Sequence, residues 1–110
     1  MTITFVKKIR RDGTPCPKCV DVEARLDAGA HWRAIDRIVV ADERDPDSEG
    51  IQLAARLGID RAPFFVVEND QETIVYTVFL RFLKEVLQAP TTAAEDAEAL
   101  LRAHPELDAL

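Results

Sequence analysis

Apolar residues recur with two different spacings along the first 88 residues of the chain. Short apolar runs bounded by turn residues predict four strands, over residues 2–9, 35–41, 64–67 and 73–79. Between and after these runs, apolar residues recur every three or four positions, which predicts helices that begin near residues 16, 48 and 80. The predicted order is strand–helix–strand–helix–strand–strand–helix.

Turn and cap residues support this division. Pro17 suits the first turn of a helix, where the missing backbone N–H removes no hydrogen bond. Asp45 or Ser48 suits the cap of the second helix, because a short polar side chain can accept a bond from a free backbone N–H. Gly29 and Gly58 fit the ends of the first two helices.

The element order predicts an α/β domain over residues 1–88. The strand–helix–strand–helix–strand part implies parallel pairing with right-handed crossovers, and the compact apolar run in residues 35–41 predicts a buried parallel strand. Residues 68–72 form a polar turn, so strands three and four form an antiparallel hairpin. We expect three layers: a four-stranded mixed sheet with helices on both faces.

The composition changes after Ala89-Pro90. Residues 89–110 are rich in alanine, glutamate and leucine and carry five acidic residues against one arginine. We predict a helix over residues 92–103 within a C-terminal acidic extension. This extension would dock on the domain, pair with another chain or fray.

Charge and hydropathy narrow the function. The 110 residues carry a net charge of −6, which argues against nucleic acid as the main partner. No apolar run approaches the ~20 residues of a membrane span. The N-terminal apolar residues precede Lys7 and Lys8, the reverse of a secretory signal. We expect a cytoplasmic protein with neither a nucleic-acid nor a membrane partner.

The candidate chemistry lies in Cys16-Pro17-Lys18-Cys19, which contains both cysteines of the chain. In a cytoplasmic protein such a pair is typical of catalysis or metal binding rather than of a structural bridge. The spacing lets one thiol attack a disulfide while the other resolves the product. The helix N-terminus should lower the pKa of Cys16, aided by Lys18 and by Arg10 or Arg11.

The motif, the element order and a proline that enters strand three after Leu57-Gly58-Ile59 together resemble the thioredoxin-like superfamily. The Cys-Pro-x-Cys form is similar to its glutaredoxin branch. The resemblance implies that Cys16 is an exposed nucleophile and Cys19 a buried resolving cysteine. It also implies a cis Pro63 and a substrate strand bound by the backbone of Ala62, with Pro17 and Lys18 beside the substrate.

The chain also departs from that branch. Glutaredoxins hold glutathione with a Gly-Gly and an acidic pair between strand four and the last helix, where this chain has Thr77-Val78-Phe79-Leu80-Arg81. We therefore expect no cofactor, and glutathione would have to bind without that motif. A protein disulfide is the favoured substrate, and the thiol reductant that recycles the pair is unidentified.

These observations predict a thiol–disulfide oxidoreductase. The alternative is a non-catalytic interaction module that docks a partner through the Pro63 groove or the acidic tail. A zinc or iron–sulfur site shared between chains is a third reading, although neither His31 nor His104 has ligand spacing to the motif. We expect His31-Trp32 to anchor a loop instead.

Overall fold

The structure is a computed structural model that describes residues 1–88, and the chain forms two compact units, residues 1–77 and 78–110. The predicted helix over residues 92–103 lies outside the described residues. The first unit contains, in order, β1 (Thr2–Ile9), α1 (Pro17–Ala28), η1 (Trp32–Ala34), β2 (Arg37–Asp42), α2 (Glu49–Leu57), β3 (Phe64–Glu68) and β4 (Thr73–Tyr76). Apart from the short 3₁₀ helix η1, every one of these elements was predicted.

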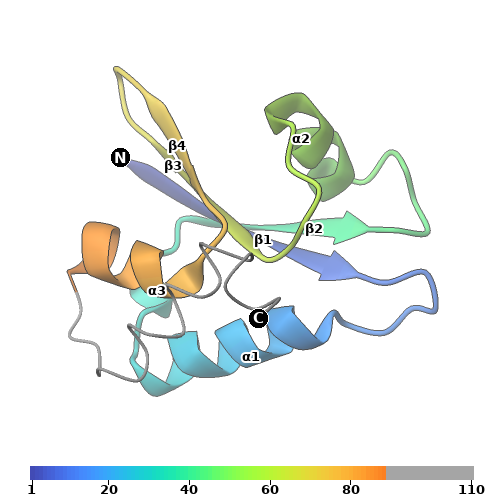
Figure 1. The fold of residues 1–110 in the computed structure, drawn as a ribbon, viewed down its shortest axis with the longest axis horizontal. Coiled ribbons are helices and arrows are strands. Elements are labelled where there is room, and N and C mark those ends of the chain that lie inside the picture. The colour runs from blue at the N-terminus through green and yellow to red at the C-terminus, as the bar shows by residue number, and fades with distance from the viewer. Residues whose placement is uncertain (89–110) are drawn as a thin grey trace, which may run out of the picture. The chain divides into compact units, whose positions relative to one another are not determined.

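The four strands form one mixed sheet in the order β2-β1-β3-β4 (Figure 1). β1 pairs in parallel with β2, from Thr4 opposite Arg37 to Ile9 opposite Asp42. The pairings of β1 with β3 and of β3 with β4 are antiparallel. The predicted mixed sheet and the hairpin are confirmed, and β1 is a central strand with a neighbour on each side.

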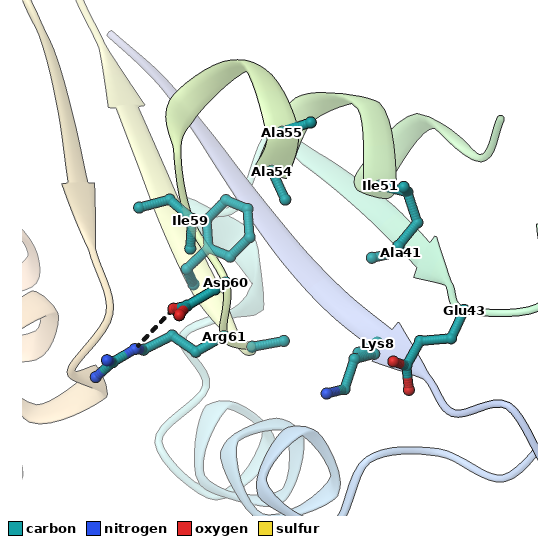
Figure 2. Close-up of a pocket in the computed structure, with 11 residues that line it drawn as sticks. Lys8, Ala41, Glu43, Ile51, Ala54, Ala55, Ile59, Asp60 and Arg61 are labelled. Atoms are coloured by element: carbon teal, nitrogen blue, oxygen red, sulfur yellow. Dashed lines mark ion pairs between the residues drawn. The ribbon is translucent and has the colours of Figure 1, made fainter. Parts of the chain in front are cut away.

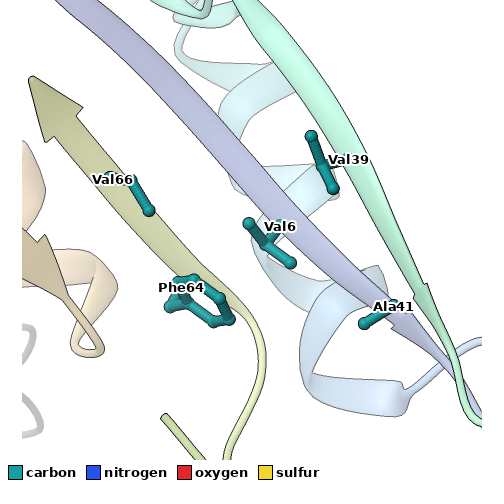
Figure 3. Packing of buried hydrophobic residues seen from close by; sticks show 5 residues of the cluster. All are labelled: Val6, Val39, Ala41, Phe64 and Val66. Carbon is teal, nitrogen blue, oxygen red and sulfur yellow. The ribbon is translucent and has the colours of Figure 1, made fainter. Parts of the chain in front are cut away.

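Helices α1 and α2 cover opposite faces of this sheet (Figure 1). Successive residues of a strand point to opposite faces, so β1 supplies side chains to both layers. On the α2 face the buried cluster consists of Val6, Val39, Ala41, Phe64 and Val66 (Figure 3). Partly buried residues pack against this cluster, including Ile51, Leu53, Ala54 and Leu57 of α2.

On the α1 face the contacts are aromatic. The ring of Phe5 in β1 stacks against that of Phe65 in β3, with centroids 5.1 Å apart, and meets the edge of Trp32 at 5.9 Å. The indole N–H of Trp32 donates to the Asp27 carboxylate at 3.1 Å. Trp32 therefore anchors the connection after α1, as we expected.

The structure corrects the prediction for the second strand. β2 is an edge strand, and only one of its faces is buried. Val39 and Ala41 lie under α2, but Ile38 and Val40 on the other face are 53% and 36% exposed. The apolar run of residues 35–41 suggested burial on both sides, because a run of side chains does not reveal which strand takes the edge of a sheet.

The end of the hairpin also differs from the prediction. β4 stops at Tyr76, whereas the predicted strand ran to residue 79. Phe79 instead opens α3 (Phe79–Phe82), which continues as the π-helix η2 (Leu83–Leu87). The predicted third helix is confirmed but begins earlier, because residues 77–79 continue the apolar pattern of the strand and hide the boundary. None of the helices within residues 1–88 has the length and apolar character needed to span a bilayer.

Gly50 sets how closely α2 approaches the sheet. A Cβ atom at this position would overlap the backbone of Val40 and Ala41 in β2. A larger residue would have to push the helix away from the strand, because the backbone atoms it meets cannot yield. The close contact of α2 with β2 therefore depends on the absence of a side chain at Gly50.

We predict that Gly50→Val lowers the free energy of unfolding by about 3 kcal/mol, since over-packing against backbone is poorly relieved. Urea denaturation measures this change. Arg56→Val, at an exposed position of the same helix, is the control and should cost less than about 1 kcal/mol. Equal losses in the two variants would contradict the packing argument.

Candidate active site

The two cysteines stand at the N-terminus of α1. Cys16 is the residue that caps the helix, with an extended backbone, and Pro17 is the first helical residue, as predicted. Cys19 lies in the first turn and belongs to the buried stripe that continues through Val22 and Leu26. Both cysteines are free thiols.

The backbone of Lys8, near the end of β1, holds both cysteines in place. Its carbonyl accepts a hydrogen bond from the Cys16 N–H at 3.1 Å, and its N–H donates to the Cys19 sulfur at 3.3 Å. A further bridge joins Ile9 to Pro15. The start of α1 is therefore attached to the central strand of the sheet.

The loop between β1 and the motif is organised by its own polar groups. The Asp12 carboxylate accepts hydrogen bonds from the hydroxyl and the N–H of Thr14, at 2.6 and 2.9 Å. These bonds hold the pKa of Asp12 below its usual value. The Arg10 guanidinium donates to the same hydroxyl at 2.9 Å, so Arg10 is engaged within the loop.

The structure corrects one expectation about Cys16. The resemblance implied an exposed nucleophile, but Cys16 is only 7% exposed and Cys19 only 2%. The bridge between Ile9 and Pro15 and the bond to Lys8 draw Cys16 into the junction of strand and helix. Its sulfur is therefore shielded, and nearby charges and dipoles act on it more strongly than they would in water.

The pKa of Cys16 is lowered despite this burial. Burial alone would raise it, but the backbone N–H groups of Cys19 and Lys18, the Cys19 thiol and the positive charge of Lys8 together outweigh that effect. Free N–H groups at a helix N-terminus favour a thiolate in this way. The direction agrees with the sequence-based prediction.

The source of the positive charge was not predicted. The sequence pointed to Lys18, Arg10 and Arg11, because they are close to the motif along the chain. Lys18 acts through its backbone N–H, and the cation that acts on Cys16 is Lys8. The hint available in the sequence was that Lys8 lies next to the last residue of the strand leading into the motif. The bridge between Ile9 and Pro15 brings this end of the strand back beside the helix.

Cys19 shifts in the opposite direction. Burial raises the pKa of Cys19 to about 11, and the negative charges of Cys16 and Glu23 add to this rise, while the bond from the Lys8 N–H opposes it. The start of α1 therefore holds one thiol whose pKa is lowered, on the cap residue Cys16, and one whose pKa is raised, on Cys19.

Ala62 and Pro63 precede β3, and the peptide bond that joins them is cis, as the resemblance implied. Ala62 also lines a pocket of about 290 Å³ between α2 and the ends of β1, β2 and β3 (Figure 2). Of the other predicted site residues, neither Pro17 nor Lys18 lines this pocket, and both are exposed.

The pocket has an apolar interior and a charged rim. The apolar residues that line it are Ala41, Ile51, Ala54, Ala55, Ile59 and Phe64. Lys8 and Glu43 extend from one side and the Asp60–Arg61 ion pair, 3.6 Å apart, from the other (Figure 2). The rim carries both signs of charge, so the pocket suits an uncharged, apolar group. Lys8 lines the pocket, and its backbone is hydrogen-bonded to both cysteines.

A metal-binding group is not assembled in the part of the chain that the structure describes. Within residues 1–88 no three His, Cys, Asp or Glu side chains gather closely enough to hold a metal ion. His104 lies outside these residues. Within residues 1–88, the two thiols therefore belong to no group of three or more such side chains that could hold a metal ion.

Comparison of the chain with protein-family models, curated proteins and solved structures finds no match. What the chain does must therefore be inferred from the geometry of its own residues.

We predict that Lys8→Met raises the pKa of Cys16, because it removes the positive charge that favours the thiolate. In a Cys19→Ser background, the midpoint of the pH profile for iodoacetamide alkylation should move to higher pH. Below that midpoint the rate should fall about twofold to threefold, because a smaller fraction of Cys16 is ionised. Lys18→Met keeps its backbone N–H and should leave the profile unchanged. The reverse ranking would contradict the assignment of Lys8.

Proposed function

We propose that the chain is a thiol–disulfide oxidoreductase of thioredoxin-like fold that cycles Cys16 and Cys19 between dithiol and disulfide. The observation that carries the proposal is the asymmetry of the two thiols within one helical turn. Hydrogen-bond donors converge on Cys16 and lower its pKa, whereas burial raises that of Cys19. An attacking and a resolving thiol need this difference.

The order and pairing of the strands and helices also support the proposal. The βαβαββα order, the parallel pair β1–β2 and the antiparallel hairpin are what the resemblance to the thioredoxin-like superfamily implies. The motif stands between the first strand and the first helix, and a cis proline precedes the third strand. These features favour this fold together, and none would suffice alone.

In the proposed reaction the Cys16 thiolate attacks one sulfur of a substrate disulfide. The S–S bond breaks, the first substrate sulfur leaves as a thiolate and takes up a proton, and the second stays bonded to Cys16. Cys19 then loses its proton and attacks the Cys16 sulfur, releasing the second substrate thiolate. The substrate gains two electrons, the Cys16–Cys19 pair loses two, and an external thiol reductant restores the dithiol.

The surroundings of the dithiol favour a protein disulfide as the substrate. Ala62 precedes the cis proline and lines the pocket, so an extended segment bound along its backbone could place a side chain there. The apolar interior and the mixed charges of the rim favour an uncharged side chain beside the substrate cysteine. No cofactor is part of this reaction.

The burial of Cys16 favours the second candidate, a non-catalytic module that binds a partner through the same pocket. Cys16 as a residue is only 7% exposed, so a local movement is needed before a protein disulfide can reach its sulfur. Under this alternative the pocket would still bind an extended segment, but no covalent partner would form. The two functions therefore differ in one measurable product, the mixed disulfide.

We predict that Cys19→Ser accumulates mixed disulfides on Cys16, because the resolving thiol is absent. Incubation with insulin or with a lysate, followed by non-reducing electrophoresis, should show adducts that a reductant removes. Cys16→Ser is the matched control and should show none. Absence of adducts with Cys19→Ser, together with no insulin reduction by the unaltered chain, would favour the non-catalytic module.

We predict that Ala54→Phe, which adds a ring on the side of α2 that faces the pocket (Figure 2), raises the KM for peptide disulfides that carry a large apolar residue next to cysteine. A loss of about 1–3 kcal/mol of binding, or roughly tenfold or more, is expected from the excluded side chain. Reduction of a small aromatic disulfide should be unaffected. Arg56→Phe adds the same ring outside the pocket and serves as the control; equal effects would argue against the pocket.

A further inference from the structure

Two successive residues of β1 contact two residues of α1 that are one helical turn apart. The Lys8 N–H donates to the Cys19 sulfur at 3.3 Å, and the Lys7 ammonium pairs with the Glu23 carboxylate at 3.1 Å. Residues four apart on a helix lie on the same face, so Glu23 follows Cys19 along the side of α1 that meets β1. A carboxylate is therefore built in beside the resolving thiol.

The ion pair is partly shielded from water. The side chains of Lys7 and Glu23 are 34% and 32% exposed, so solvent and salt screen their charges less than those of a fully exposed pair. The titratable groups that act on Cys19 are Cys16, which caps α1, and Glu23 of α1. From β1, the Lys8 backbone N–H bonds to the Cys19 sulfur, and the Lys7 ammonium pairs with Glu23. Among these neighbours, Glu23 is the carboxylate.

A negative charge near Cys19 disfavours its thiolate, and burial acts in the same direction. The resolving step requires that thiolate, so its rate depends on how often Cys19 loses its proton. The positive charge of Lys7 offsets part of the effect by pairing with the carboxylate. The two charges would therefore act on Cys19 in opposite senses.

We propose that Glu23 is a positioning residue that slows the attack of Cys19 on the mixed disulfide, and that Lys7 limits this effect. The proposal rests on the proposed function. In the step concerned, the Cys19 thiol loses its proton to solvent and its thiolate bonds to the Cys16 sulfur. The bond from Cys16 to the substrate sulfur breaks, and that sulfur leaves with the electron pair. Glu23 does not touch the reacting sulfurs; it changes how readily Cys19 ionises and so prolongs the covalent complex.

The test uses the chain with 2-nitro-5-thiobenzoate attached to Cys16 as a mixed disulfide, and follows release of the coloured thiol by Cys19. Glu23→Gln should speed release about twofold near neutral pH, the size expected when one helical charge neighbour is removed. The gain should shrink at high pH, where Cys19 is ionised in both proteins. Lys7→Met should slow release, and Glu23→Asp, which keeps the charge, should restore the original rate.

Opposite effects of Glu23→Gln and Lys7→Met would not arise from a purely structural role, because loss of either partner breaks the same contact. Unchanged or slower release in Glu23→Gln would overturn the proposal. Titration of Cys19 by thiolate absorbance in Cys16→Ser tests the charge effect without any redox step. If Cys16 forms no mixed disulfide at all, the proposed function fails, and this titration alone then decides whether Glu23 acts on Cys19.

Discussion

The backbone of Lys8 is the constraint on which the site depends. Its carbonyl and N–H are both used by the motif, one by the Cys16 amide and the other by the Cys19 sulfur. A single hydrogen bond of this kind contributes only about 1 kcal/mol to stability. The two bonds matter more for where the thiols lie, because β1 is a central strand whose register is fixed on both sides by β2 and β3. The sheet thereby sets where the thiols stand.

This attachment explains how a buried thiol can have a lowered pKa. Burial strengthens every electrostatic interaction around a sulfur, whether it favours or opposes ionisation. At Cys16 the surrounding groups are donors and a cation, so shielding increases their combined influence. Cys19 is also shielded from water, but its neighbours are the Glu23 carboxylate and the Cys16 thiol, and both oppose its ionisation. The pKa values of two chemically identical thiols, three residues apart, are therefore shifted in opposite directions.

Much of this arrangement can be predicted from the sequence, because it follows from local signals. Apolar periodicity locates the strands and helices, Pro17 marks the first turn of α1, and Gly58 ends α2 in the left-handed conformation that glycine favours. The two cysteines and their order relative to the helix also follow from spacing. The boundary at Phe79 was misplaced because strand and helix there share an apolar pattern.

The burial of Cys16, the edge position of β2 and the role of Lys8 could not be predicted in the same way. Each depends on contacts between segments far apart in the chain, such as the pairing of Ile9 with Pro15. Proximity in sequence favoured Lys18 as the cation near Cys16, whereas pairing across the loop brings Lys8 there. Sequence patterns report what a residue prefers locally, and these three features were decided by tertiary structure.

The alternation of a β-strand gives the two lysines at the end of β1 separate tasks. Successive side chains point to opposite faces. Lys7 therefore meets Glu23 on the α1 face, while Lys8 lines the pocket beneath α2, beside Glu43 on its rim (Figure 2). The Lys8 backbone between them holds the thiols. The lysine that pairs with Glu23 near Cys19 and the lysine that lines the candidate binding pocket are thus one residue apart, and a shift of register by one residue would turn each to the opposite face.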